Sequence, residues 1–325
     1  MAEAIPLALF AAPARRRRAR PTPEMKAVLV ALLWIWALAL PAAAQQQIAI
    51  TFDDLPSHSA LPADTTRVDI AKQIIAALKD ANVPAYGFMN GLRLVDEPLS
   101  APVLQLWRDA GFPIGNHTYS HMNLNRVPLA DWEDDVVRNE GVLAPLMSGG
   151  DWRWLRFPFL AEGDTLAKHD AVRAFLAGRG YRIAAVTLSF DDYLWNEPYA
   201  RCVAKGDKAT IAAMETAYLD AAQTSLFYYH ALSQELYGRD IPYVLLMHLG
   251  AFDARMLARL LALYLAKGVT FVSLDQAEAD PFYRVDSDPR LPAGPVTLEQ
   301  AMAAHGMAYY PARVAQVMSF DTLCR

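Results

Sequence analysis

The sequence predicts an α/β fold, a distorted (β/α) barrel of about seven parallel strands with helices on the outside. Short apolar segments with strand character alternate with helical segments from residue 48 to residue 274. Repeated alternation of this kind is typical of a parallel sheet covered by its crossover helices. A doubly wound open sheet is the competing fold, but no glycine-rich phosphate-binding turn follows the first strand.

The predicted strands are short runs rich in aliphatic, aromatic and β-branched residues. The first of them, 48–52, reads Ile-Ala-Ile-Thr-Phe and is expected to be buried. In chain order the predicted strands are 48–52, 84–89, 112–115, 154–159, 181–188, 243–247 and 269–274.

The predicted helices lie between these strands and have recognisable faces or ends. The first carries five aliphatic residues on one broad face: Val68, Ile70, Ile74, Ile75 and Leu78. The segment 131–146 begins with an acidic turn, which suits the helix dipole, and 165–178 ends at a glycine. In chain order the predicted helices are 65–82, 99–110, 131–146, 165–178, 210–236, 253–267 and 298–305.

The composition excludes several classes of protein. Of the 325 residues, 54% are hydrophobic and 20% are charged, which provides for a large core and excludes a disordered chain. The formal net charge of −5 leaves no global positive charge to hold a nucleic acid backbone. Two cysteines are too few for a disulfide scaffold or a four-cysteine zinc site.

The first 44 residues have the pattern of a leader that carries a secretory signal. A cluster of arginines precedes Met25 and Lys26, an apolar run follows at 27–40, and small residues end at Ala44. The apolar run is shorter than the roughly 20 residues that span a bilayer. We therefore expect cleavage after Ala44, a single domain at 45–325, no stable membrane span, and a periplasmic or extracellular location.

The start of the chain allows two interpretations. Met25 followed by Lys26 would itself begin a compact signal peptide, which makes residues 1–24 an upstream extension of the reading frame. The alternative is a genuine, unusually long basic leader. Both cysteines lie in the exported part, so an oxidising compartment favours a disulfide between Cys202 and Cys324. The alternative is a pair of buried thiols.

Polar residues follow five of the predicted strands at the point where each strand ends. In chain order these are Asp53 and Asp54, His117 and His121, Arg156, Asp191 and Asp192, and His248. Because the carboxyl ends of parallel strands meet at one rim, we expect these side chains to share one cleft.

The pair His117 and His121 is the strongest metal signal. Residues four apart in a helical turn lie on one face, so both imidazoles could reach one ion. A carboxylate from another strand would complete three ligands and leave a position open for water, which is the pattern of catalytic zinc. Two ordinary helix histidines are the alternative.

The neighbouring charged residues each have a functional and a structural interpretation. Side chains of Asp53 and Asp54 diverge in a strand, so one could bind the metal while the other faces the water; an Asx turn is the alternative. Arg156 in an apolar stretch needs a carboxylate partner, unless it reaches solvent at the strand end. His248 is a candidate proton donor, or else a satisfied core histidine.

Together these motifs resemble the polysaccharide deacetylases, the NodB-homology group in family four of the carbohydrate esterases. Two positions depart from the family pattern: Phe159 stands where many members have Tyr, and Tyr193 replaces a Trp. The five motifs are Thr51-Phe52-Asp53-Asp54, His117-Thr118-Tyr119-Ser120-His121, Arg156-Phe157-Pro158-Phe159, Asp192-Tyr193 and Leu246-Met247-His248.

The resemblance implies a metal-dependent hydrolysis of N-acetyl amides on an amino-sugar glycan. It implies a metal, usually zinc, on Asp54, His117 and His121. It makes Asp53 the general base and His248 the general acid. Arg156 and Asp192 are implied as their respective partners, and the substrate-binding residues are implied to be Pro158, Phe159, Tyr193, Trp195 and Leu246. Within this set the Phe159 backbone N–H is the expected oxyanion donor.

Two other functions remain open at this stage. The same metal site could cleave a small cyclic amide instead of a sugar acetamide. An exported chain favours the glycan, because walls and extracellular polysaccharides lie outside the cytoplasm. The third possibility is a carbohydrate-binding protein with an inactive site, which only the change to Tyr193 supports.

Overall fold

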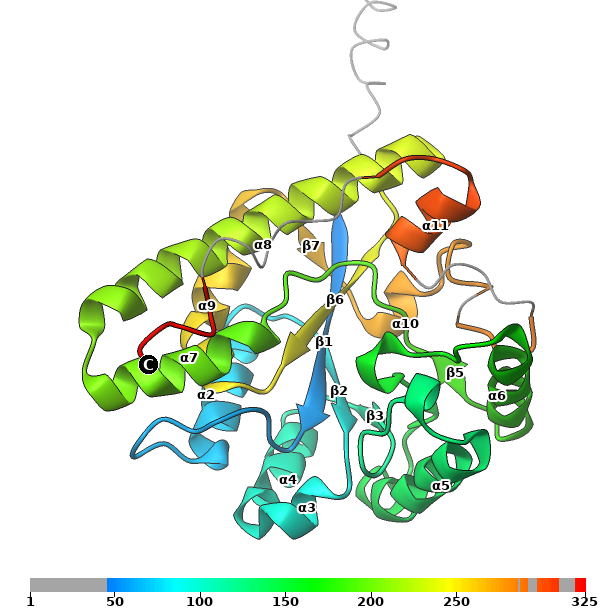
Figure 1. Cartoon of the computed structure of the whole chain (residues 1–325), viewed down its shortest axis with the longest axis horizontal. Helices are drawn as coiled ribbons and strands as arrows, with labels where there is room; N and C mark the ends of the chain where they lie inside the picture. Colours follow the sequence, from blue (N-terminus) through cyan, green and yellow to red (C-terminus); the bar gives the residue numbers. More distant parts are fainter. Residues whose placement is uncertain (1–45, 286, 292–296, 310–318) are drawn as a thin grey trace, which may run out of the picture. The chain divides into compact units, whose positions relative to one another are not determined.

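The strand β1 (Gln47–Leu55) lies between β2 and β6 in a sheet whose strands all run parallel (Figure 1). The computed structural model describes residues 46–285, 287–291, 297–309 and 319–325. The predicted leader at 1–44, including the start at Met25, lies outside these residues. Within the described ranges, no helix combines the length and apolar character that a membrane crossing requires.

The sheet has the strand order β5-β4-β3-β2-β1-β6, and β7 pairs with the start of β1. The other strands are β2 (Ala85–Met89), β3 (Ile114–Asn116), β4 (Trp154–Leu155), β5 (Arg182–Ile183), β6 (Tyr243–His248) and β7 (Thr270–Phe271). The residues of β1 and β6 are almost all buried, which explains why apolar residues predominate in both strands.

The ring of strands closes through the segment that follows β5. Leu188 forms a parallel bridge with Leu245 of β6, and the Thr187 and Leu188 N–H groups donate to the Val244 carbonyl. The predicted distorted barrel is therefore confirmed.

The predicted strand 181–188 is regular only at Arg182–Ile183, because side chains take over its backbone groups. The guanidinium of Arg156 donates to the carbonyls of Ala184 and Ala185, and the Ala185 N–H donates to Glu278. These bonds replace part of the regular ladder.

Ten helices are described within these ranges, and they surround the strands (Figure 1). They are α2 (Arg67–Asp80), α3 (Arg93–Asp96), α4 (Pro102–Asp109), α5 (Leu129–Leu146), α6 (Leu166–Gly178), α7 (Tyr193–Lys205), α8 (Lys208–Tyr237), α9 (Ala251–Ala266), α10 (Leu274–Ala277) and α11 (Leu298–Ala304). Thr66 and Asp69 form a capping box that begins α2, close to the predicted start.

Three further differences separate the predicted elements from the structure. The helix predicted at 210–236 is α8, and a further helix, α7, precedes it after a break at Gly206, which has φ 66°. The strand predicted at 154–159 ends at Leu155, because Pro158 begins a short 3₁₀ turn, η3 (Pro158–Leu160), in which Phe159 has φ 59°. The strand predicted at 269–274 gives way to α10.

The predicted disulfide between Cys202 of α7 and Cys324 is present. It holds the described C-terminal residues 319–325 against α7. Arg201 reinforces this attachment, since its guanidinium donates to the carbonyls of Phe320 and Leu323. The segment is thus fixed to the helix that begins directly after Asp192.

Candidate active site

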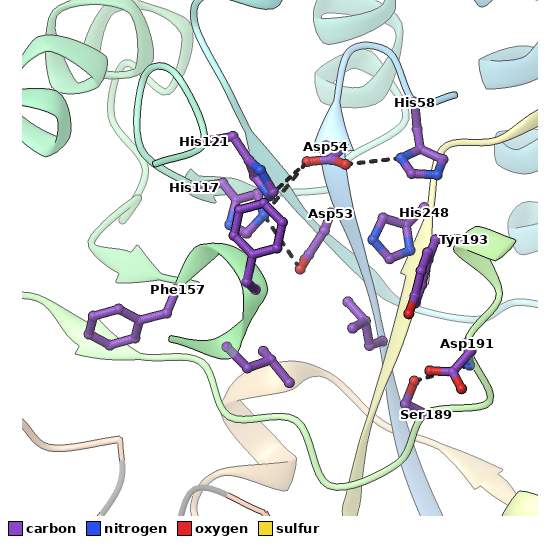
Figure 2. A pocket seen from close by; sticks show the side chains of 13 residues that line it. Asp53, Asp54, His58, His117, His121, Phe157, Ser189, Asp191, Tyr193 and His248 are labelled. Atoms are coloured by element: carbon purple, nitrogen blue, oxygen red, sulfur yellow. Dashed lines mark hydrogen bonds and ion pairs between the residues drawn. The ribbon is translucent and has the colours of Figure 1, made fainter. Parts of the chain in front are cut away.

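A cavity of about 450 Å³ opens where β1, β3 and β6 end (Figure 2). Eight of the twelve site residues expected from the sequence line it, and four lie behind its wall. The lining residues are Asp53, Asp54, His117, His121, Phe159, Tyr193, Leu246 and His248, and those behind are Arg156, Pro158, Asp192 and Trp195. The five predicted strand ends thus meet at one site.

The two adjacent aspartates point to different partners. Asp53 is the last residue of β1 in register with β6, and it pairs with His248, which places the two side by side. Asp54 has φ 61° and lies where the pairing of β1 with β2 shifts register. This irregularity turns the Asp54 carboxylate toward the histidines, as the divergence of the two side chains predicts.

The buried Arg156 holds the Asp53 carboxylate. Its Nη1 lies 3.1 Å from Asp53 Oδ1 and 3.2 Å from Oδ2, and its Nη2 donates to Thr51 Oγ1. The side chain has no solvent exposure, so the alternative of an arginine that reaches solvent is wrong. A buried guanidinium with this many acceptors fixes the position of its carboxylate partner.

His117 and His121 approach each other through a loop and not through a helical turn, so that part of the prediction is wrong. Thr118 and His121 both have positive φ angles, 60° and 59°, which are incompatible with a helix. The loop nevertheless places the Nε2 atoms of His117 and His121 at 3.7 and 3.4 Å from Asp54 Oδ1. The fold of this loop therefore brings the two imidazoles to Asp54.

The trio Asp54, His117 and His121 fits a divalent metal ion. Their ligand atoms lie within 4.8 Å of one another, and Asp54 Oδ1 is buried without a hydrogen-bond partner among the described residues. His117 Nδ1 donates to the Arg156 carbonyl at 2.7 Å, which leaves Nε2 as the ligand atom. Burial and the neighbouring His117 lower the pKa of His121 to about 4, so its imidazole is neutral at pH 7. One carboxylate oxygen and two imidazole nitrogens form a donor set that suits zinc.

The candidate acid His248 is paired with the fully buried Asp192. His248 Nδ1 lies 3.0 Å from Asp192 Oδ1, and the backbone N–H of His248 donates to Asp192 Oδ2 at 2.6 Å. Burial on its own would lower the pKa of His248, but Asp192 and the nearby aspartates raise it to about 10. The imidazole is therefore protonated at neutral pH.

Residues 41–174 match the family model described as polysaccharide deacetylase. The resemblance to the polysaccharide deacetylases that the motifs predict is therefore confirmed. The chain is 29% identical over 113 residues to a peptidoglycan-N-acetylglucosamine deacetylase of Bacillus cereus, covering 35% of this chain and 36% of that protein. It is 29% identical over 153 residues to a chitin deacetylase of Colletotrichum lindemuthianum, covering 46% and 54%. The chain thus spans less than two thirds of the length of either relative.

The fold of the chain also matches that of solved structures. A family 4 carbohydrate esterase pseudoenzyme from Bacillus anthracis superimposes with a TM-score of 0.50 at 15% identity, covering 72% of this chain and 66% of that chain. At this identity the likeness concerns the fold alone.

Two of the expected substrate contacts need correction. Trp195 is 1% exposed and packs against Tyr218, Phe252 and Phe320, so no sugar ring can stack on it. Pro158 is also buried and lies outside the cavity lining. Tyr193, in contrast, is 42% exposed on the cavity wall, with its ring 5.6 Å from that of His248.

The cavity also contains a residue that the sequence did not reveal. His58 lines the cavity, and its Nδ1 lies 2.9 Å from Asp54 Oδ2 (Figure 2). The signal was present, because His58 is one of only seven histidines and follows Asp54 by four residues. Nothing in that spacing distinguishes it from a surface histidine until the loop is folded.

Proposed function

We propose that this protein is an exported, metal-dependent deacetylase that removes N-acetyl groups from an amino-sugar glycan of the chitin or peptidoglycan type and releases acetate. The observation that carries the proposal is the convergence of three groups on one cavity. These groups are the donor trio of Asp54, His117 and His121, the carboxylate of Asp53, and the imidazole of His248. The predicted signal and the disulfide support export.

The trio Asp54, His117 and His121 would hold the metal, which we propose to be Zn²⁺ or a similar divalent ion. When bound, such an ion lowers the pKa of water and polarises a carbonyl. The two histidines need not lose a proton before they bind the ion. The His117 Nδ1 proton is committed to the Arg156 carbonyl, and His121 is neutral.

Asp53 is the proposed general base. It lines the cavity, and its carboxylate is only 3% exposed and fixed on one side by Arg156. A base that is held in one position can take the proton from the attacking water without first reorganising. Arg156 also offsets the negative charge of Asp53 in a buried setting, which permits two neighbouring carboxylates to coexist there.

His248 is the proposed general acid. When the tetrahedral carbon collapses, the C–N bond breaks and the sugar nitrogen needs a proton, because an amide anion is a poor leaving group. His248 donates that proton and acetate leaves. Asp53 then releases to solvent the proton that it took from the attacking water, and the imidazole regains a proton from water. Asp192 keeps the imidazole charged until this step.

The remaining cavity residues supply the substrate contacts. We propose that Leu246, which lines the cavity, contacts the acetyl methyl group, and that the exposed ring of Tyr193 faces a sugar ring. The backbone N–H of Phe159 is the proposed donor to the oxyanion, since η3 presents this residue at the cavity.

Acetate release from a panel of N-acetylated glycans tests the proposal. We expect chitin oligomers or peptidoglycan to release acetate, the release to stop with a chelator, and Zn²⁺ to restore it. Bound zinc without acetate from any glycan would contradict the glycan substrate and favour a hydrolase of small cyclic amides. Absence of both zinc and acetate would favour an inactive carbohydrate-binding protein.

The substitution Asp192→Asn should shift the alkaline limb of the pH profile of kcat/KM to lower pH. The acid works only while His248 is protonated, so activity falls as pH rises through its pKa. Asp192 raises that pKa, and removing an adjacent anion lowers it by about one to three units. Asp207→Asn is the matched control, because Asp207 is the N-cap residue of α8 just as Asp192 is the N-cap residue of α7. This control should leave the alkaline limb at the same pH. An unchanged limb in Asp192→Asn would contradict the role of Asp192.

A further inference from the structure

The strongest unassigned feature of the cavity is His58, on the loop that follows β1. The two oxygens of the Asp54 carboxylate have different surroundings: Oδ1 faces the Nε2 atoms of His117 and His121, and Oδ2 faces His58 (Figure 2). Because a carboxylate oxygen can only accept, the 2.9 Å contact requires that His58 Nδ1 carries the proton and donates. One Asp54 oxygen is thus already committed outside the proposed metal site.

The loop that carries His58 is itself held in place. The buried guanidinium of Arg67 donates to the carbonyl of His58 and to that of Ser59, both at 2.7 Å. The same guanidinium is paired with Glu97 through two bonds of 2.8 and 3.0 Å. A connected chain therefore runs from Glu97 through Arg67 and His58 to Asp54.

The other face of His58 packs against the proposed acid. Its ring centroid lies 4.5 Å from that of His248, and the side chain of His58 is only 14% exposed. The ring is consequently confined on one side by Asp54 and on another by His248, so its Nδ1–H has little freedom to leave the carboxylate.

We propose that His58 is a positioning residue that presents Asp54 to the metal through a single oxygen, Oδ1. This inference rests on the metal site of the proposed function. Hydrogen-bond partners of metal ligands restrict the orientation of the ligand, and their loss typically weakens metal binding by about 10- to 100-fold. Without His58 the Asp54 carboxylate can rotate, and the metal must then select one of several orientations.

The test is a zinc titration of the apo protein against a chromogenic chelator, which needs no glycan. We expect the Kd for Zn²⁺ to rise by about 10- to 100-fold in His58→Ala. His58→Asn should recover most of the affinity, because the asparagine Nδ2 can replace the donor at Nδ1. His230→Ala is the matched control: His230 also has Nδ1 at 2.8 Å from an aspartate, Asp240, but lies on α8 outside the cavity lining. It should bind zinc like the unaltered protein.

Three results would overturn the inference. The first is a zinc affinity of His58→Ala within about twofold of the unaltered protein. The second is an equal loss of zinc affinity in His58→Ala and His58→Asn, because the hydrogen bond to Asp54 would then not be the cause of the loss. A loss as complete as in His117→Ala would make His58 a ligand instead of a positioning residue. If the unaltered protein binds no zinc, the proposed function itself fails. If the unaltered protein binds zinc and His58→Ala binds it equally well, only the positioning role of His58 fails, so the two failures are distinguishable.

Discussion

The substitution Asp53→Asn should lower kcat for acetate release by about 10²- to 10⁴-fold while zinc stays bound. An asparagine amide has nearly the shape of the carboxylate but cannot take a proton from water. Its oxygen can still accept from Arg156 Nη1, which now lies 3.1 Å from Asp53 Oδ1, so the geometry of the site is largely kept. Acetate release and metal content of the same preparation provide the measurement.

A matched control separates the loss of the base from the loss of an ion pair. Asp280 is also mostly buried and receives two bonds of 2.8 Å from Arg239, but it lies outside the cavity lining. Asp280→Asn should therefore keep its activity. If Asp53→Asn instead loses its zinc, the roles of the two adjacent aspartates are exchanged.

The parts of the fold that were predictable are those determined by burial. Apolar residues predominate in β1, β2 and β6 because both faces of each strand are covered, and the sequence shows this directly. The short strands β4, β5 and β7 were predicted too long. In β5 the reason is that Arg156 and Glu278 bond to the backbone beyond it, and such long-range contacts leave no local pattern.

The cavity was predictable to the extent that strand ends share one rim. The position of each side chain on that rim was not. Tyr193 and Trp195 were both expected to bind substrate, but α7 begins at Tyr193, so the two side chains point about 200° apart around the helix. One therefore lines the cavity and the other is buried. His58 was missed for a related reason, since only the fold of its loop brings it to Asp54.

The substitution His117→Ala should remove the metal, reducing the zinc content from about one ion per chain to near zero. His117 is 2% exposed and its Nε2 is one of three donor atoms, so its loss leaves only Asp54 and His121. Two protein donors do not retain zinc against a chelator as three do. The measurement is metal analysis after dialysis, with acetate release assayed in parallel.

His169→Ala is the control for His117→Ala, because His169 lies on α6 beside Glu162 and lines no part of the cavity. It should retain zinc and activity. Unchanged zinc in His117→Ala would contradict its role as a ligand. The two variants also test each other, since Asp53→Asn loses turnover but keeps the metal, whereas His117→Ala loses the metal and turnover with it. General misfolding would abolish both properties in both variants, so this difference is specific to the proposed division of roles between the base and the metal ligands.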